Sequence, residues 1–287
     1  MSRIIGPSGR KLHFSHKGHN KAHKMNITSR DNSLLRQARA VRDGKIEELI
    51  FVEGLRLCEE ALRSNLEIEA VIVSEELLRK ERVAATINEL SRVSKRVGSV
   101  SEKLLASISY TKTPQGIVVL AQRPESSEER LAASLNANSL LVVLHQINNP
   151  VNVGAILRTA EAAGATGVIT TANTSDPFSP KSLRGAMGSA FRLPIWSGVS
   201  FEDVIEWCRK RGIKSICADA EAQTAYTEID WTKRNALILG PESTGFMPQE
   251  LESADEIVHI PMKGDAESLN VSVAAGILLF EASRQRM

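Results

Sequence analysis

Apolar residues in the first part of the chain either recur at helical spacing or gather in short runs. The segment 33–41 has its apolar residues on one face of a helix, at Leu34, Leu35, Ala38 and Val41. Apolar runs predict strands at 49–52, 70–73, 96–100 and 116–121, with a helix at 54–64 and two short helices within 75–92. This alternation of strand and helix predicts an α/β domain over residues 31–121.

A second alternation begins after residues 122–138, a polar segment typical of a linker between domains. Strands are predicted at 140–145, 167–170, 193–196, 214–218, 235–239 and 256–260, and helices at 153–163, 180–187, 201–210 and 270–284. The pattern predicts an open parallel sheet with helices on both faces over residues 139–287. In such sheets ligands bind at the carboxyl ends of the strands, so the loops at those ends form the candidate site.

The first of these loops, residues 148–154, ends in a predicted helix. Asn152 is expected at the start of that helix, where it could cap the backbone and still point into the cleft. Arg158 follows on an otherwise apolar helix, so its charge needs a partner or a function. Taken alone, the two residues favour a helix cap and a structural ion pair.

The second loop, residues 239–246, is rich in glycine but does not match a nucleotide-binding fingerprint. Gly245 is followed by Phe and Met, where a phosphate-binding loop has Lys and Ser or Thr. The chain also lacks a Gly-x-Gly-x-x-Gly sequence after a strand, which weakens readings as a nucleoside triphosphate or nicotinamide enzyme. Taken alone, the segment around Glu242 predicts only a turn.

The third loop leads from Ile260 into a C-terminal helix of small, apolar residues. Ser268 and Asn270 stand at the predicted helix start, where such residues are usually caps. The positive end of this helix could also stabilise an anionic group.

Charge is distributed unevenly along the chain. The net charge is +2, with 36 basic and 34 acidic residues. Seven of the basic residues and none of the acidic ones lie in residues 1–30, which predicts a basic, disordered arm. The arm is either a phosphate contact or a solvated tail, and a transit peptide is less favoured because no amphipathic stripe is present.

Cysteine and histidine usage argues against a metal or disulfide framework. The three cysteines are far apart and include no Cys-x-x-Cys pair, as suits a reducing cytosol: Cys58, Cys208 and Cys217. Four arm histidines lack a rigid support and favour a pH-sensitive arm over a metal site: His13, His16, His19 and His23. No apolar run approaches the roughly 20 residues that span a bilayer, so no membrane partner is expected.

In this order and spacing, the three loops resemble the motifs of the SpoU/TrmH family (SPOUT superfamily) of RNA 2′-O-ribose methyltransferases. The matching sequences are Asn-x-Gly…Arg from Asn152, Leu-Gly-x-Glu-x-x-Gly from Leu239, and Ile-Pro-Met-x-Gly…Ser-Leu-Asn-Val-Ser from Ile260. The resemblance covers residues 140–287. The first domain is similar to the substrate-binding module of the family, a ribosomal-protein-like α/β fold, through residues 51–54 and 113–116.

The resemblance implies a C-terminal α/β-knot (trefoil-knot) domain, a homodimer with a shared site, and S-adenosylmethionine (SAM) as methyl donor, with no metal. It implies cofactor contacts at Gly240, Ile260, Leu269, Met262 and Thr171. It implies catalytic roles for Arg158, Asn152, Ser268, Asn270 and Glu242. Either Arg158 is a base or it anchors the target phosphate and the developing alkoxide; a guanidinium has no acceptor lone pair, which favours the anchor.

The RNA contacts are expected on the first domain. Arg36, Arg39 and Arg42 share one face of the first helix, which is either an RNA-binding face or a solvated one. The added domain favours 23S or large-subunit ribosomal RNA as substrate, with transfer RNA as the alternative. A non-catalytic RNA-binding protein of the same fold, and a different α/β enzyme with a nucleotide cofactor, are the rival hypotheses. A cytoplasmic location is expected.

Overall fold

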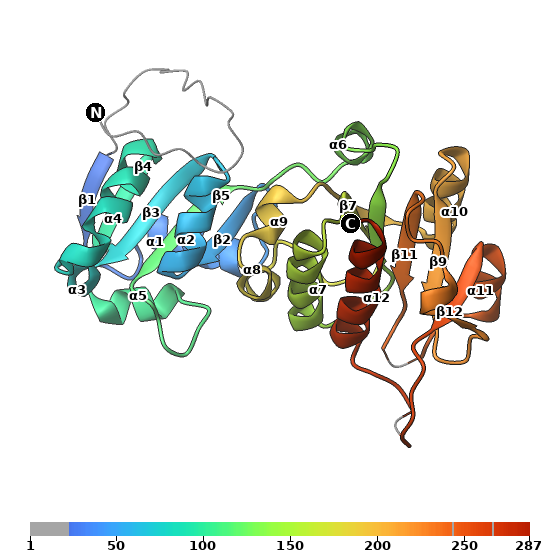
Figure 1. The fold of residues 1–287 in the computed structure, drawn as a ribbon. Coiled ribbons are helices and arrows are strands. Elements are labelled where there is room, and N and C mark those ends of the chain that lie inside the picture. The colour runs from blue at the N-terminus through green and yellow to red at the C-terminus, as the bar shows by residue number, and fades with distance from the viewer. Residues whose placement is uncertain (1–22, 243, 266) are drawn as a thin grey trace.

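The computed structural model describes residues 23–242, 244–265 and 267–287, which form two α/β units in succession (Figure 1). The first unit has a five-stranded sheet and the second a seven-stranded sheet. A stretch containing the short helix α6 (Glu128–Ala133) joins them.

The first unit is a mixed sheet with helices on its faces. Its strands lie in the order β1-β4-β3-β5-β2, in which β1, β4 and β3 are parallel and β5 is antiparallel to β3 and β2. In chain order the elements are β1 (His23–Ile27), α1 (Ser33–Arg42), β2 (Leu49–Glu53), α2 (Leu55–Arg63), β3 (Ile68–Ser74), α3 (Glu75–Leu78), α4 (Glu81–Val93), β4 (Arg96–Val100), α5 (Glu102–Ile108) and β5 (Ile117–Gln122).

The second unit is a wholly parallel sheet in the order β10-β12-β9-β11-β6-β7-β8. Its elements are β6 (Leu140–Leu144), α7 (Pro150–Ala162), β7 (Gly167–Thr171), α8 (Pro180–Ala186), α9 (Ser189–Arg192), β8 (Ile195–Val199), α10 (Phe201–Lys210), β9 (Lys214–Ala218), β10 (Thr224–Ala225), a 3₁₀ turn (Tyr226–Glu228), β11 (Asn235–Leu239), α11 (Pro248–Ser253), β12 (Glu256–His259) and α12 (Val271–Gln285).

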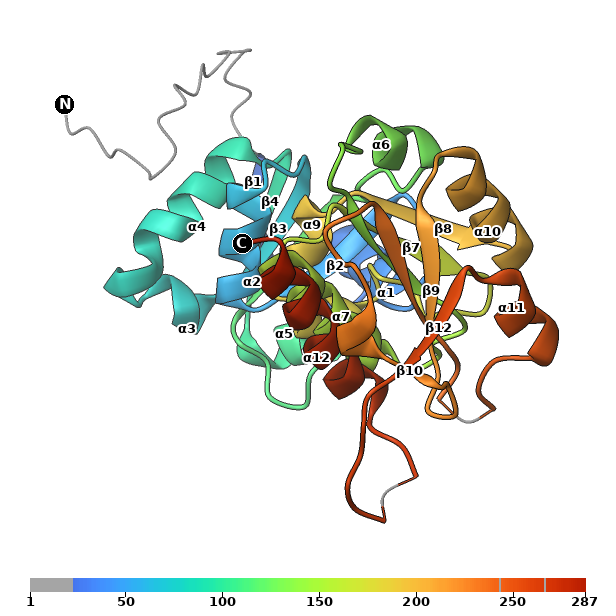
Figure 2. The same ribbon diagram turned by 45° about the vertical axis from the view of Figure 1, so that its right-hand side comes forward.

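The two central strands of the second sheet, β6 and β11, are buried along their whole length. Alternate residues of β6 face a core made with α7, α8 and α12, and the others face a core made with α6, α10 and α11. This double cover explains why these strands appear in the sequence as unbroken apolar runs. In both views α7 and α12 lie side by side (Figures 1 and 2).

Several predictions of local structure need correction. Residues 23–27 form strand β1, paired with β4, so the predicted disordered arm cannot extend to residue 30. The rest of that prediction, with His13, His16 and His19, lies outside the described residues. Helix α7 begins at Pro150 and is capped by Asn149, not by Asn152, because proline is favoured in the first helical turn. Helices α9 and α11 and strand β10 were not predicted.

Ion pairs and an aromatic contact join the two units. Arg192 of α9 bonds to Glu60 of α2 at 2.5 Å and also holds Glu161 of α7. Arg123 makes a two-pronged contact with Asp176, at 3.0 and 2.5 Å, and its guanidinium lies over the ring of Phe178. These contacts fix the first unit against helices α7 to α9.

Helices α7 and α8 cross where glycine faces glycine. A Cβ atom on Gly154 would lie 2.4 Å from the carbonyl oxygen of Ser182 and 2.9 Å from the Cα of Gly185. Both neighbours are backbone atoms, which cannot move away by a side-chain rotation. The glycine of the Asn-x-Gly motif is therefore required by the crossing of these helices, which sets the position of α7.

We expect Gly154→Ala to lower the free energy of unfolding by about 1–3 kcal/mol, as for other overpacked cores. The matched control is Gly276→Ala in α12, where the new Cβ would meet Thr159 at 4.0 Å. That change should stabilise by about 0.5–1 kcal/mol, because alanine is the better helix former. Urea denaturation of both variants measures this, and equal stabilities would contradict the close crossing.

Candidate functional site

The candidate site lies at the carboxyl ends of strands β6, β11 and β12. Because these strands are parallel members of one sheet, the loops that follow them emerge at the same edge. Helices α7 and α12 begin at this edge and lie beside each other. The three sequence motifs are therefore neighbours in space.

The carboxamide of Asn152 joins the three loops. Its Nδ2 donates a hydrogen bond to a carboxylate oxygen of Glu242, in the loop after β11. Its Oδ1 accepts a bond of 3.4 Å from the Nδ2 of Asn270, at the start of α12. Asn152 is 6% exposed, and both the nitrogen and the oxygen of its buried carboxamide have a hydrogen-bond partner. The structure thus brings together three of the predicted catalytic residues.

Asn270 is held in place as the N-cap of α12. Its Oδ1 accepts bonds from the backbone N–H of Ser272 at 3.0 Å and from the Ser272 hydroxyl at 2.5 Å. The Oδ1 atom of Asn270 is therefore used to cap the helix, and its Nδ2 hydrogens remain available to bond to Asn152. Ser268, two residues earlier, is exposed, and within the described residues its hydroxyl has no hydrogen-bond partner.

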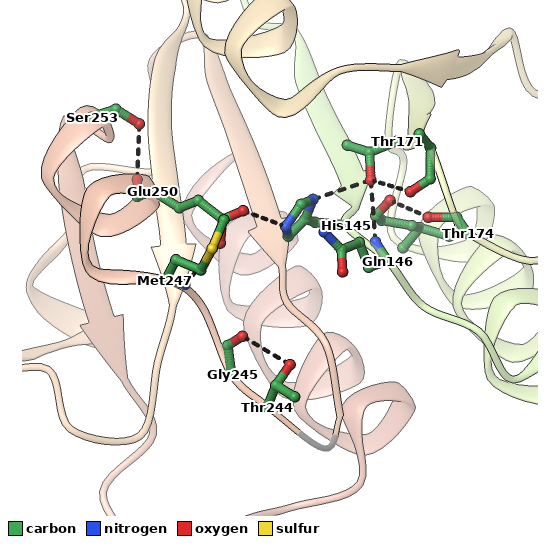
Figure 3. A network of polar contacts seen from close by, with 11 residues as sticks. His145, Gln146, Thr171, Thr174, Thr244, Gly245, Met247, Glu250 and Ser253 are labelled. Carbon is green, nitrogen blue, oxygen red and sulfur yellow. Dashed lines mark hydrogen bonds and ion pairs between the residues drawn. The ribbon is translucent and has the colours of Figure 1, made fainter.

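A second polar network lies next to the loop after β11 (Figure 3). His145, at the end of β6, is 2% exposed. Its Nε2 lies 2.9 Å from Oε1 of Glu250, and its Nδ1 lies 3.0 Å from the hydroxyl of Thr171. Thr171 also accepts a bond from the backbone N–H of Gln146, and Glu250 accepts one from that of Met247 at 2.8 Å.

One pairing of donors and acceptors in this network has His145 neutral, and the Thr171 hydroxyl then shares its single proton between Nδ1 and the carbonyl oxygen of Ala172, which lies 3.3 Å away. Nε2–H donates to the Glu250 carboxylate, and Nδ1 accepts from the Thr171 hydroxyl. Burial lowers the pKa of His145, and the nearby Glu250 carboxylate opposes this shift without cancelling it. The neutral form is thus the one that the fold favours.

The network fixes the loop that carries Gly240 and Glu242. The ring of His145 stacks on Phe246, with ring centroids 5.9 Å apart and an interplanar angle of 5°. Phe246 in turn closes over Gly240, where a Cβ would lie 2.6 Å from the ring. Only glycine fits at this point, so the glycine of the second motif permits the aromatic ring to pack.

The sequence predicts His145 only as the end of a strand and assigns no role to Glu250. Two signals were available. A histidine ends a fully apolar strand directly before a motif loop, and Glu250 stands three residues after Met247 beside Pro248, as in the first turn of a helix. Neither signal shows that the two side chains meet, because they are 105 residues apart.

The predicted cofactor residues gather at this edge of the sheet with different exposures. Gly240 and Ile260 are half-buried, whereas the side chains of Met262 and Leu269 are 36% and 37% exposed. Thr171 is 3% exposed and its hydroxyl is engaged by His145 and Gln146, so it does not project into the site. Met262 and Leu269 are thus partly exposed apolar residues in the segment between β12 and α12.

Arg158 lies away from the Asn152 cluster. The two residues are six positions apart on α7, which separates them by about 9 Å along the helix and about 120° around it. The Arg158 side chain is exposed, and within the described residues it has no ion pair. It lines a cavity of about 400 Å³ between the two units, together with Arg56 and Arg63 of α2 and with Glu161 and Arg192.

The three arginines predicted to bind RNA differ in their surroundings. Arg36 is exposed. Arg39 donates to the carbonyl oxygen of Arg30. Arg42 bonds to Asp43 at 2.8 Å and to the carbonyl oxygens of Ile108 and Ser109, so its guanidinium ties α1 to the end of α5. Arg42 therefore has a structural role, and its contact with RNA stays a prediction.

The two recognisable sequences of the first unit meet at Gly54, where a Cβ atom would lie 2.5 Å from Oε1 of Gln115. Glu53, at the end of β2, accepts bonds from the backbone N–H groups of Tyr110 and Thr111 at 2.8 and 3.2 Å. The backbone N–H of Gly54 donates to the carbonyl oxygen of Ile117 at 3.1 Å. The loop 109–116 is thus held against β2, with the ring of Tyr110 45% exposed.

Metal ligation and thiol chemistry find little support in the described part of the chain. There, no group of three or more His, Cys, Asp or Glu side chains converges in a way that could hold a metal ion. The three cysteines are free and buried, and desolvation raises the pKa of each thiol. None of the described helices has the length and apolar character that a bilayer crossing requires.

Comparison with known proteins gives consistent matches over both units. The family model "SpoU rRNA Methylase family" matches residues 139–280, and "MRM3-like substrate binding domain" matches residues 34–119. The chain is 31% identical over 230 residues to the 23S rRNA (guanosine(2553)-2′-O)-methyltransferase RlmP of Bacillus subtilis, covering 80% of this chain and 86% of that protein.

Two further matches agree. The 23S rRNA (guanosine-2′-O-)-methyltransferase RlmB of Coxiella burnetii is 33% identical over 210 residues, covering 72% of this chain and 84% of that protein. The AdoMet-bound rRNA methyltransferase from Sinorhizobium meliloti superposes with a TM-score of 0.79 at 30% identity, covering 91% of this chain and 98% of that one.

The His145 network predicts a pH dependence of stability. The pKa of His145 in the fold lies below its unfolded value of about 6.5. As the pH falls, the unfolded chain takes up the proton first. The stability contributed by neutral His145 is therefore complete above about pH 6.5 and is lost as the pH falls through that value towards the folded pKa.

We expect His145→Gln to be less stable than the wild type at pH 7.5 by about 1–3 kcal/mol, because the buried Glu250 loses a partner. The difference should shrink at pH 5.5, as measured by urea midpoints. Thr174→Val is the matched control, since it removes a nearby bond to the carbonyl oxygen of Leu144 without removing a titrating group. A wild-type pH dependence in His145→Gln would contradict the neutral-histidine assignment.

Proposed function

The chain belongs to the SpoU rRNA methylase family, and from this premise we propose that it transfers a methyl group from SAM to a ribose 2′-hydroxyl of 23S ribosomal RNA. The family and the fold class predicted from the sequence are confirmed: a SPOUT-type α/β domain with a parallel sheet, preceded by a substrate-binding α/β domain. The prediction that it is an enzyme is confirmed with them.

The observation that carries this proposal is the hydrogen-bonded chain Glu242–Asn152–Asn270. A non-catalytic relative would have no need to hold a carboxylate and two carboxamides at the edge where the three loops meet. We assign Asn152 and Asn270 the positioning of the ribose and of the surrounding loops. Glu242 orients Asn152, and the exposed Ser268 is free to contact the ribose.

When bound, SAM supplies an electrophilic methyl group. The backbone around Gly240, Ile260 and Leu269 would hold it, with Met262 and Leu269 covering its apolar parts. The attacking 2′-hydroxyl becomes a good nucleophile only as its proton leaves, and we assign solvent water as the acceptor of that proton. Arg158 cannot accept a proton in its charged form, so we assign it the anchoring of the target phosphate and the stabilisation of the developing alkoxide.

The surroundings of Arg158 support an anchoring role. The charged lining of its cavity consists of four arginines and three glutamates: Arg56, Arg63, Arg158, Arg192, Glu59, Glu60 and Glu161. The glutamates hold Arg63 and Arg192, whereas Arg56 of the first unit and Arg158 of the second have no ion pair among the described residues. Guanidinium groups bind phosphate through two parallel hydrogen bonds. An RNA strand held between the units would therefore place a phosphate beside Arg158.

We further propose that the enzyme is a homodimer whose sites are shared. Val151 and Arg158 are seven positions apart on α7, and Val273 and Phe280 are seven apart on α12, so each pair lies on one helix face. The three apolar side chains are 46%, 51% and 53% exposed. A second copy covering this face would bury them and would bring its own Arg158 towards the Asn152 cluster that a single chain cannot reach.

The substrate assignment rests on the relatives and on the first unit. Both curated relatives named above act, by their names, on 23S rRNA. We keep residues 31–121, extended by β1, as the RNA-binding domain, residues 122–138 as linker and residues 139–287 as the methyltransferase domain. Transfer RNA is the alternative substrate, and we propose a cytoplasmic location because ribosomal RNA is found there.

We expect Arg158→Ala to lose methyl transfer by about 100-fold or more, in line with removal of a group that stabilises developing charge. SAM binding, measured by calorimetry, should not change. The assay is transfer of labelled methyl from SAM to 23S rRNA and, in parallel, to transfer RNA. Arg209→Ala is the control, because that exposed arginine lies on α10, across the sheet.

Wild-type turnover by Arg158→Ala would refute its role. Methylation of transfer RNA alone would favour the alternative substrate. A wild-type protein that binds SAM weakly or not at all, and methylates neither RNA, would leave the non-catalytic RNA-binding protein as the better hypothesis.

Association is tested separately. The double variant Val273→Glu and Phe280→Glu should be monomeric by light scattering and should lose methyl transfer, because buried charge without a partner is costly. Val93→Glu is the control, since Val93 on α4 is equally exposed at 53% but lies in the first unit. A wild type that is monomeric at micromolar concentration would contradict the shared site.

A further inference from the structure

The edge of the second sheet opposite the candidate site carries a cavity of about 910 Å³. It lies at the amino ends of β6, β9 and β11, beside the last turn of α12. In Figure 1 the C-terminus marks this end, opposite the long loop between β12 and α12. The methyl-transfer site therefore does not account for the cavity.

The cavity is lined by cations. Lys214, Lys233, Arg234 and Arg286 border it, and the described residues that line it include no acidic side chain. Two carboxylates lie nearby. Lys214 pairs with Glu256 at 2.9 Å, and Lys233 approaches Asp230 at 4.0 Å.

The guanidinium groups of Arg234 and Arg286 bond to backbone carbonyl oxygens and have no ion pair among the described residues. Arg234 donates to the carbonyl oxygen of Arg211 at 2.9 Å, and Arg286 donates to those of Ala282 and Lys233 at 3.2 and 2.8 Å. The Nε atoms of both are buried and have no hydrogen-bond partner among the described residues. Burial lowers the pKa of Arg286, against the attraction of Asp230, so its charge is poorly solvated.

Poorly solvated guanidinium groups beside an open cavity favour the binding of an anion. A partially buried cation without a carboxylate is costly, and a phosphate accepts several N–H donors at once. The cavity exceeds the volume of one phosphate group, so it can admit a phosphate that is part of a longer molecule. From these observations we propose that this cavity binds a phosphate of the RNA backbone, as a second contact remote from the methylated ribose.

The remote position fits a large substrate. Strands of five residues span about 17 Å, so the cavity and the site lie at least that far apart across the sheet. A ligand that engages both ends at once must be a polyanion of macromolecular size, as in the proposed function, on which this inference rests. Contacts of this kind fix the register of an RNA without reading its sequence.

The test compares two exposed lysines, one at the cavity and one away from it. Lys233→Glu reverses a charge at the cavity and leaves its backbone carbonyl for Arg286. Lys210→Glu reverses one on α10, where Lys210 is similarly exposed (66% against 75%) and also pairs with a neighbouring carboxylate. Binding of a 23S rRNA fragment is measured by anisotropy over a salt titration.

We expect Lys233→Glu to bind the fragment about 10-fold more weakly and to lower the slope of log affinity against log salt by about one. Lys210→Glu should keep the wild-type slope. Unchanged RNA binding in Lys233→Glu, or equal weakening in both variants, would overturn the proposal.

A pyrophosphate titration of the wild type and Arg234→Gln, with thermal unfolding as a check on folding, separates the two sources of phosphate. Loss of pyrophosphate binding together with weaker RNA binding supports the proposal. Loss of pyrophosphate binding with unchanged RNA binding would mean that the cavity holds a free phosphate compound. If the wild type binds the fragment but does not methylate it, the proposed activity fails while the cavity can still be assessed by the salt slopes.

Discussion

The hydrogen bonds of the Asn152 carboxamide are the contacts on which the candidate site depends. Asn152 donates to Glu242 and accepts from Asn270, so one buried amide joins loops that follow three different strands. A buried amide that loses a partner costs about 1–3 kcal/mol, which makes partial assembly of the three loops unfavourable. The parallel sheet brings the loops to one edge, and this amide fixes their final positions.

Two supports keep Asn152 and Glu242 where they are. Gly154 lets α7 approach α8 backbone to backbone, which positions the helix that carries Asn152. His145 holds Glu250 and stacks on Phe246, which positions the loop that carries Glu242. Neither support is expected to touch a substrate. Gly154 and His145 are therefore more than ordinary core residues, because they limit how far the loops can move.

Periodicity predicted most of the framework, since the 3.6-residue and two-residue repeats report directly which faces are buried. The buried face of α1 and the bounds of β4, α10 and β9 agree with the prediction. Edge strand β1 was missed because its residues continue a basic arm without an apolar run. Helix α7 was placed three residues late because Asn149 and Pro150 form its start, a signal that the Asn152 motif obscured.

The candidate site was predicted less evenly, and the reason is that spacing along a chain does not give direction in space. Asn152, Glu242 and Asn270 lie together, as the motifs imply. The Thr171 hydroxyl instead bonds to His145, and Arg42 bonds to the carbonyl oxygen of Ile108 at the end of α5. Arg158 is the most informative case. It belongs to the same motif as Asn152, but the helix carries it to another face, beside exposed apolar residues. In the proposed homodimer this arginine would serve the cluster of a second copy, which would also make activity depend on association.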